Sequence, residues 1–134
     1  MQEYFQRIDR KEEHPIMPIT ELLERNAAQW PDDVALIEIN PDSDKKRSDN
    51  WAEFALVEQD ASGTYYRREM SWIDFDRKAN QFAHLLLANG IGRGDKVAIL
   101  LMNCLEWLPI YFGTLKAGAI AVPLNYRYTA EEIR

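Results

Sequence analysis

The sequence contains one cysteine, Cys104, among its 134 residues. A single cysteine excludes an internal disulfide framework and a zinc site built from several cysteines. Lys and Arg number only 16 against 22 Asp and Glu, which gives a net charge of −6. This acidic excess argues against nucleic-acid binding, which depends on a basic surface. Because nothing in the cysteine usage favours an oxidising compartment, we predict a cytoplasmic protein.

The sequence also lacks a run of about 20 uninterrupted apolar residues, so it predicts no membrane span. Its most apolar stretch, residues 97–124, is broken by polar residues such as Asn103 and Glu106. The first 15 residues carry charges of both signs without an apolar core, unlike a signal peptide. We expect residues 1–15 to form a flexible arm and residues 16–134 to belong to a folded domain.

Apolar residues make up 46% of the sequence, which is enough for a folded core. Their helical spacing predicts a first helix, capped by Thr20 and ended by Pro31. The β-branched run VALIEI at 34–39 predicts a strand. Residues 40–50 contain no apolar side chain and predict an exposed loop, whose basic residues 45–47 should face solvent rather than bind phosphate.

Two further strands are predicted over residues 52–58 and 64–70, joined by the turn QDASG. This pattern indicates an antiparallel hairpin in which Gly63 takes a positive φ. The clearest helix follows, with Ser71 as its N-terminal cap and Gly90 as its left-handed end.

The unbroken apolar run at 97–102 predicts a strand that is buried on both faces. Asn103 and Glu106 have the spacing of a capping box, so a helix is expected from Asn103 to about Ala117. A strand at 120–124 should follow. This strand–helix–strand order predicts that the two strands are parallel. Pro109 lies inside the expected helix, so we predict a kink there or a separate first turn.

The sequence ends shortly after another helix signal. Thr129 and Glu132 form a capping box, and the last residue is Arg134. A helix of about five residues does not repay its nucleation cost. We therefore expect the 134 residues to be part of a longer protein, truncated in a helix that starts near residue 130.

Residues that could carry chemistry are few and scattered. Gly90, Gly92 and Gly94 follow a predicted helix rather than a strand, which favours a tight turn over a dinucleotide site. His14 and His84 are isolated from each other and from acidic clusters in the sequence. A structural role is therefore favoured for His84 over a catalytic one.

The other candidates also favour structural roles. Cys104 is expected at a helix N-terminus among apolar neighbours, which favours a buried, inert thiol. Four aromatic residues at helical spacing favour core packing over a stacking platform: Trp72, Trp107, Tyr111 and Phe112. The sequence therefore assigns no catalytic, cofactor-binding or metal-binding residue.

From residue 65 onward, the sequence resembles the N-terminal part of the adenylate-forming enzymes. The segment MSWIDF at 70–75 is similar to the first core motif of that superfamily, L-[ST]-Y-x-E-L. The segment LKAGAIAVPLN at 115–125 is similar to the second, L-K-A-G-x-A-x-V-P. Between them, GIGRGDKVAILLMN at 90–103 matches the run G-[VI]-x-x-G-D-x-V-A-[IL]. The resemblance covers about residues 16–134.

The resemblance implies an α/β fold, namely the N-terminal part of the large domain, with a small antiparallel hairpin followed by βαβ units. Asn125 stands where amino-acid adenylation domains usually have Asp, and in this it looks more like acyl- and aryl-CoA ligases. The resemblance therefore favours an acyl-CoA synthetase, with fatty acid metabolism as its expected context. Such a parent enzyme would use ATP, Mg²⁺ and CoA to convert a carboxylate into its thioester. In the family, a Ser/Thr/Gly-rich loop that ends in Lys binds ATP farther along the chain. We therefore expect the 134 residues alone to bind no cofactor and to be inactive.

Two alternatives stay open: an amino-acid adenylation domain of a peptide synthetase, and a non-enzymatic interaction module. For an acyl-CoA synthetase, the expected partners are the remainder of the parent chain and a small carboxylic acid. Self-association is a further expectation. The strands at 97–102 and 119–124 are apolar on both faces, and few helices are available to cover them.

Overall fold

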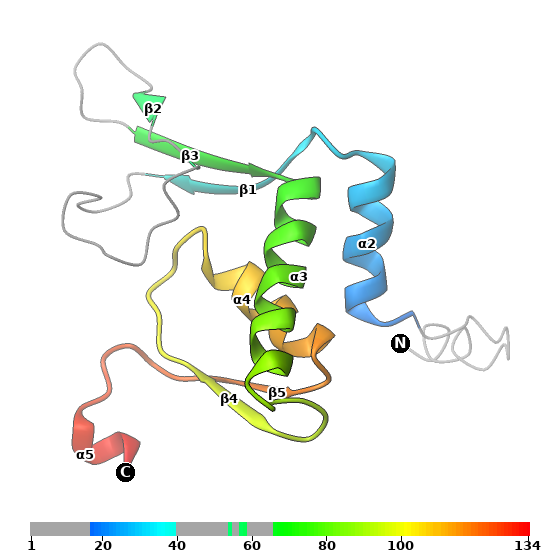
Figure 1. Ribbon diagram of the computed structural model, residues 1–134. Helices are drawn as coiled ribbons and strands as arrows, with labels where there is room; N and C mark the ends of the chain where they lie inside the picture. The colour runs from blue at the N-terminus through cyan, green and yellow to red at the C-terminus, as the bar shows by residue number, and fades with distance from the viewer. Residues whose placement is uncertain (1–16, 40–53, 55–56, 59–65) are drawn as a thin grey trace, which may run out of the picture.

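The computed structural model describes residues 17–39, 54, 57–58 and 66–134. In chain order, the described elements are α2 (Ile19–Gln29), β1 (Val34–Ile39), β2 (Val57–Glu58), β3 (Tyr66–Ser71), α3 (Trp72–Ala88), β4 (Lys96–Ile99), α4 (Trp107–Lys116), β5 (Ile120–Pro123) and α5 (Ala130–Ile133). Two small sheets lie at opposite ends of a helical layer formed by α2, α3 and α4 (Figure 1). The predicted arm at 1–15, the loop at 40–50, Gly63 and His14 lie outside the described residues.

The first sheet has the strand order β1-β3-β2, and both pairs are antiparallel. The pairing of β2 with β3 confirms the predicted hairpin over its described part. The sequence did not predict that β1 would form the third strand. In the register between β1 and β3, Glu38 lies opposite Arg68.

Helix α3 begins directly where β3 ends. The Ser71 hydroxyl accepts a hydrogen bond from the Asp74 amide at 3.3 Å, which confirms the predicted cap. After the helix, Gly90 has a φ of +77°, a conformation that favours glycine. The end predicted for this helix is therefore also confirmed.

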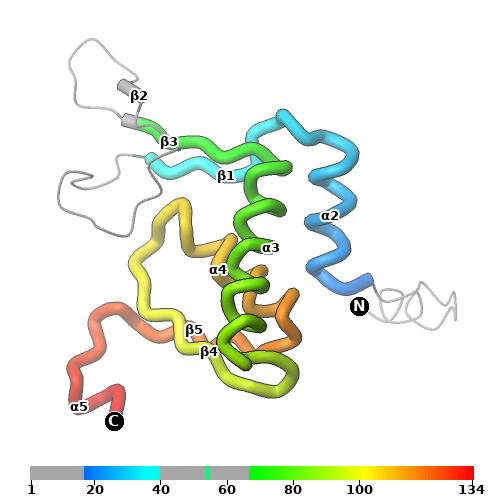
Figure 2. Tube along the Cα trace, in the orientation of Figure 1, coloured from blue at the N-terminus to red at the C-terminus, as the bar shows by residue number. Residues whose placement is uncertain are grey.

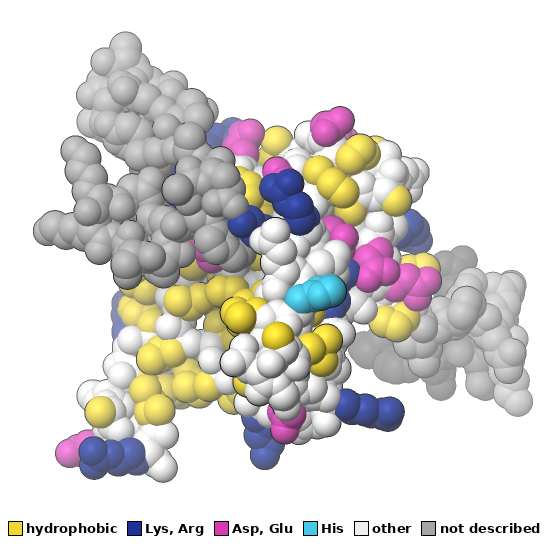
Figure 3. Space-filling model, in the orientation of Figure 1, with side chains coloured by type: hydrophobic (Ala, Val, Ile, Leu, Met, Phe, Trp, Pro, Cys, Tyr) yellow, Lys and Arg dark blue, Asp and Glu magenta, His cyan; other side chains and the backbone are white. Residues whose placement is uncertain are grey.

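The second sheet contains β4 and β5, which pair in parallel as predicted. Gly118, with a φ of +77°, lies between α4 and β5 and allows the chain to reverse. Strand β4 ends at Ile99, so the strand predicted over 97–102 is too long. Apolar side chains gather near this sheet in the space-filling view (Figure 3).

Helix α4 begins at Trp107, so the start predicted at Asn103 is wrong. Glu106 precedes the helix without forming a side-chain cap, because its carboxylate binds Arg68. Pro109 lies in the first turn of α4, where a backbone N–H has no intrahelical acceptor. The prediction of a kink or a separate first turn at Pro109 is therefore wrong.

The N-terminal caps predicted for the first and last helices, α2 and α5, differ in how they compare with the structure. Helix α2 begins at Ile19 after Pro18, so Thr20 lies inside its first turn and the predicted Thr20 cap is wrong. The capping box of α5 is confirmed, since Thr129 and Glu132 bind each other reciprocally through side chain and backbone.

The main core lies between α2, α3 and the sheet formed by β1 and β3. Its buried residues are Leu23, Phe54, Met70, Phe75, Ala79 and Leu105. Helices α3 and α4 pack closely because Gly113 has no side chain. A Cβ atom at Gly113 would lie 2.6 Å from the carbonyl oxygen of Ala79 and 2.9 Å from the Cβ of Phe82.

Lys116 joins the three helices through two ion pairs. Its Nζ lies 2.6 Å from a carboxylate oxygen of Glu24 on α2 and 2.9 Å from one of Asp76 on α3. Burial by itself would lower the pKa of Lys116, but the hydrogen bonds and charges of both carboxylates outweigh burial and raise it.

We predict that Gly113→Ala lowers the free energy of unfolding by about 1–3 kcal/mol, because the new methyl group collides with the α3 backbone. The collision should outweigh the gain in helix propensity, about 1 kcal/mol. Urea unfolding measures the difference. Gly92→Ala is the control, since its nearest non-neighbouring atom lies 3.6 Å from the new Cβ, and it should unfold like the wild type. A Gly113→Ala protein as stable as the wild type would contradict the prediction.

We also predict that Lys116→Met loses stability in a pH-dependent way. Because the folded-state pKa of Lys116 is raised above 10.5, its contribution is complete below pH 10.5 and is lost as the pH rises through the folded-state pKa. The difference in unfolding free energy between wild type and variant should therefore shrink between about pH 10.5 and 12. Lys96→Gln, at an exposed lysine of β4, is the control and should not reproduce this profile. A difference that is constant across this range would refute the assignment.

Candidate functional site

A buried cluster of three charged side chains joins the antiparallel sheet to the turn before α4. Arg68 on β3 donates from Nε to Glu38 on β1 at 3.0 Å and from Nη1 to Glu106 at 3.1 Å. A further hydrogen bond joins Nη2 of Arg68 to Glu38. The side chains of Arg68 and Glu106 are only 1% and 2% exposed, and that of Glu38 is 10% exposed.

Successive side chains of β3 point to opposite faces of the sheet, and this explains why Arg68 is buried while its neighbours are not. Arg68 shares the inward face of the strand with Met70, whereas Arg67 and Glu69 occupy the opposite face and form an ion pair there. The register places Glu38 of β1 directly opposite Arg68. Figure 2 shows the segment after β4 passing towards β1 before α4 begins, and this path brings Glu106 to the same guanidinium.

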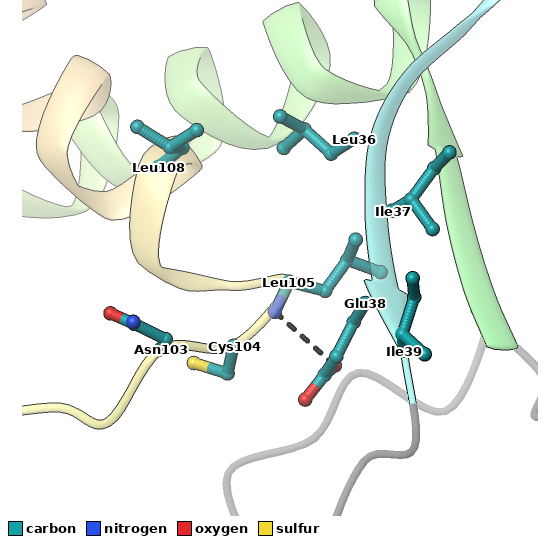
Figure 4. A pocket seen from close by; sticks show the side chains of 8 residues that line it. All are labelled: Leu36, Ile37, Glu38, Ile39, Asn103, Cys104, Leu105 and Leu108. Atoms are coloured by element: carbon teal, nitrogen blue, oxygen red, sulfur yellow. Dashed lines mark hydrogen bonds between the residues drawn. The ribbon is translucent and has the colours of Figure 1, made fainter. Parts of the chain in front are cut away.

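The cluster holds one positive charge against two carboxylates. Burial alone would lower the pKa of Arg68, but hydrogen bonds and charge interactions with Glu38 and Glu106 outweigh burial and raise it. Oε2 of Glu38 also accepts the backbone N–H of Leu105 at 3.3 Å (Figure 4). The guanidinium is thus held between the sheet and the turn by charge-assisted hydrogen bonds.

A pocket of about 280 Å³ lies beside this cluster, between β1 and the turn that leads into α4. In Figure 4, Glu38 points from β1 towards the segment that carries Asn103 and Cys104. The lining residues are Leu36, Ile37, Glu38, Ile39, Asn103, Cys104, Leu105 and Leu108. The pocket is therefore lined by aliphatic side chains together with a carboxylate, an amide and a thiol.

The groups around the pocket do not fit a metal ion or a nucleotide phosphate. Within the described ranges, no three His, Cys, Asp or Glu side chains gather in a way that could hold a metal. The buried cation beside the pocket, Arg68, already binds two carboxylates. The geometry instead suits a structural role, in which the cluster fixes the sheet against α4.

The structure places the glycine and histidine candidates away from this pocket. Gly90 and Gly94 have φ values of +77° and +90° in the turn between α3 and β4, which confirms the predicted tight turn. His84 lies exposed on α3. It lines a shallow groove along that helix together with Ile73 and Arg77, and not the pocket beside Arg68.

Cys104 does line the pocket, but its expected environment is wrong in two respects. It lies three residues before the start of α4 rather than at its first turn, and its side chain is half-buried. Cys104 therefore lies in the turn before the helix.

The aromatic residues divide between two settings. Trp72 and Phe112 pack against the main core, as predicted. Trp107 and Tyr111 stack on each other, with ring centroids 5.3 Å apart and an angle of 12° between the planes, and both are half-buried. The core-packing prediction is thus confirmed for Trp72 and Phe112.

Sequence reasoning missed the charged cluster itself. One signal was Glu38, which interrupts the apolar strand between Ile37 and Ile39. Another was Arg68, which lies two residues before the apolar Met70 and therefore on the same face of the strand. A charge on the apolar face of each of two strands indicates a buried pair, although neither signal identifies Glu106 as the third member.

None of the helices in the described part of the chain has the length and hydrophobicity needed to cross a membrane.

Comparison with known proteins gives consistent matches. A family model described as AMP-binding enzyme matches residues 23–134. The crotonobetaine/carnitine–CoA ligase of Citrobacter koseri is 41% identical over 78 residues, which is 58% of this chain and 15% of that protein. The long-chain-fatty-acid–CoA ligase FadD13 of Mycobacterium tuberculosis is 41% identical over 64 residues, 48% of this chain and 13% of that protein.

The fold comparison agrees with these relatives. The structure of a Mycobacterium tuberculosis fatty acyl CoA synthetase superposes with a TM-score of 0.62 at 30% identity. The match covers 86% of this chain and 18% of that one. It confirms the predicted fold class. The matched part of the chain covers only about 15% of the length of the curated relative from Citrobacter koseri.

We predict that Arg68→Met lowers the free energy of unfolding by about 3–5 kcal/mol, because it leaves Glu38 and Glu106 buried without their cation. Urea unfolding at neutral pH measures the loss.

The matched control is Arg67→Met, one residue away on the half-exposed face of the same strand. It breaks a surface ion pair and should cost at most about 1 kcal/mol. Equal losses in the two variants would contradict a structural role for the buried cluster.

Proposed function

The chain belongs to the AMP-binding enzyme family, and from this membership we propose that it is the N-terminal structural part of an ATP-dependent acyl-CoA synthetase. The observation that carries the proposal is the family match over residues 23–134, which includes both core motifs. In the proposed reaction, a carboxylate oxygen attacks the α-phosphorus of ATP and pyrophosphate leaves. The thiol of CoA then attacks the acyl carbon, and AMP leaves as the thioester forms.

Two observations support CoA as the acceptor. The second motif ends in Asn125, rather than the Asp usual in amino-acid adenylation domains. The two relatives described above are both named as CoA ligases, one for crotonobetaine or carnitine and one for long-chain fatty acids. Because these two acids differ in charge and length, the proposal names a carboxylic acid as substrate without choosing its chain length.

The described residues serve this function by shaping the domain. The first core motif forms the junction at which β3 ends and Ser71 caps α3. The second motif forms the end of α4, the reversal at Gly118 and strand β5. Between them, the charged cluster at Arg68 fixes the antiparallel sheet to the start of α4.

The groups that bind ATP, Mg²⁺ and CoA are proposed to lie outside these 134 residues. The sequence contains no Ser/Thr/Gly-rich loop that ends in Lys, and the buried Arg68 is engaged by carboxylates. In the complete enzyme, Mg²⁺ would neutralise charge on the phosphates. The remainder of a longer chain is then the first partner of this segment, and the cytoplasm stays its predicted location.

The complete translation product of the gene that encodes these residues tests the proposal. We expect it to catalyse exchange of pyrophosphate into ATP in the presence of a carboxylic acid. We also expect CoA to be converted into a thioester with release of AMP. A panel of short, long, aromatic and trimethylammonium-bearing acids identifies the substrate class, and a panel of amino acids is run in parallel.

The 134-residue chain alone is the control and should show no exchange above background. Exchange that depends on amino acids without thioester formation on CoA would favour a peptide-synthetase adenylation domain instead. A complete product that shows neither reaction with any acid would overturn the proposal, and exchange by the 134 residues alone would refute their assignment as structural.

A further inference from the structure

Strand β1 carries a β-bulge near its start. Val34 lies opposite Ser71 and Leu36 lies opposite Met70, so β1 has one more residue than β3 between these two pairs. One extra residue on one of two antiparallel strands is the mark of a bulge. Past it, the pairing is regular to the end of β1. The bulge therefore moves every later residue of β1 by one position along β3.

The apolar residues of β1 do not explain this register. Leu36 and Glu38 share the inward face of the sheet with Arg68, because opposite residues in an antiparallel pair lie on one face. Ile37 and Ile39 lie on the outer face and are 49% and 55% exposed. In Figure 4, Leu36 and Glu38 extend from β1 towards the turn before α4, and Ile37 lies on the other side of the strand. The strand thus turns a carboxylate inward and two isoleucines outward.

A register without the bulge would reverse this arrangement. Pairing that continued from the first pair without an extra residue would place Ile37 opposite Arg68 and Glu38 opposite Arg67. Because a shift of one residue moves each side chain to the other face, both isoleucines would point inward and the carboxylate outward. The exchange would bury two isoleucines and expose one leucine, Leu36. The apolar pattern of β1 therefore favours this unbulged register.

The charged cluster favours the observed, bulged register. The Glu38 carboxylate accepts Nε of Arg68 at 3.0 Å and the backbone N–H of Leu105 at 3.3 Å. Both contacts require Glu38 to point inward. Arg68 would keep its hydrogen bonds to Glu106 in either register, because Glu106 lies outside the sheet. The contacts of Glu38 are therefore the part of the cluster that depends on the register of β1.

We propose that the Glu38 carboxylate holds β1 in the bulged register against the unbulged register that its isoleucines favour. Fixing a register is the best-attested use of a buried polar or ionic group. Residues 40–56 separate β1 from β2, so the chain between these strands is long enough to take up a shift of one residue, about 3.4 Å. Strand β1 is then an element with two registers, and one buried side chain selects between them.

Nuclear magnetic resonance of the 134-residue chain measures the register through nuclear Overhauser effects between the backbones of opposite residues. In the wild type, we expect these effects between Ile37 and Glu69. Glu38→Thr removes the carboxylate and supplies a side chain that suits an exposed strand position. In this variant the effects from Ile37 should move to Arg68, and the population of the bulged register should fall at least about tenfold.

Glu69→Thr is the matched control, because it removes an ion-paired glutamate from the outer face of the same sheet. Its register should stay bulged, with Ile37 still opposite position 69. Adding Ile37→Thr and Ile39→Thr to Glu38→Thr should restore the bulged register, since Leu36 is then the side chain that gains by pointing inward.

A Glu38→Thr chain that keeps the bulged register would overturn the proposal. So would a Glu38→Thr chain that fails to fold, because the unbulged register is expected to accept this substitution. A control that shifts in the same way, or a triple variant that stays unbulged, would also count against it.

Discussion

The described structure depends on one buried guanidinium. Arg68 receives Glu38 from the neighbouring strand and Glu106 from a turn 38 residues farther along the chain, so it joins the antiparallel sheet to the start of α4. Desolvation of a buried ion is costly, and here charge-assisted hydrogen bonds on both sides of the guanidinium offset that cost. The turn from Asn103 to Glu106 takes its path from this contact, and the pocket beside β1 follows from that path.

Local signals in the sequence predicted the elements that depend on near neighbours. The strand at 34–39, the Ser71 cap, the reversals at Gly90 and Gly118, and the parallel pairing of β4 with β5 all follow from spacing and residue type within a short window. The predicted start of α4 was wrong because a residue far away in the sequence binds the side chain that was expected to cap the helix. Glu106 was expected to complete a capping box with Asn103, but its carboxylate binds Arg68 and the helix starts later. Periodicity along the strands could indicate the pair Glu38 and Arg68 but not Glu106, because Glu106 comes from a separate segment.

The two core motifs share a structural logic. Each lies where one kind of regular structure changes into another: β3 into α3 at Ser71, and α4 into β5 at Gly118. At such positions a cap or a left-handed residue satisfies or redirects the backbone. In the described part of the chain, no group of His, Cys, Asp or Glu residues that could hold a metal accompanies these motifs. Their residues are therefore explained by the geometry of these junctions, whereas the chemistry of the family is proposed to reside elsewhere.

The junction at Ser71 has a mechanical consequence. Ser71 is both the last residue of β3 and the cap of α3, so no loop residue separates the strand from the helix. A strand and a helix joined in this way move as one rigid unit. Bending between them would break the cap of α3 or the last strand pair, Val34 with Ser71. Any hinge that lets the two ends of this segment move relative to each other would then lie beyond α3, in the glycine-containing turn at 90–94.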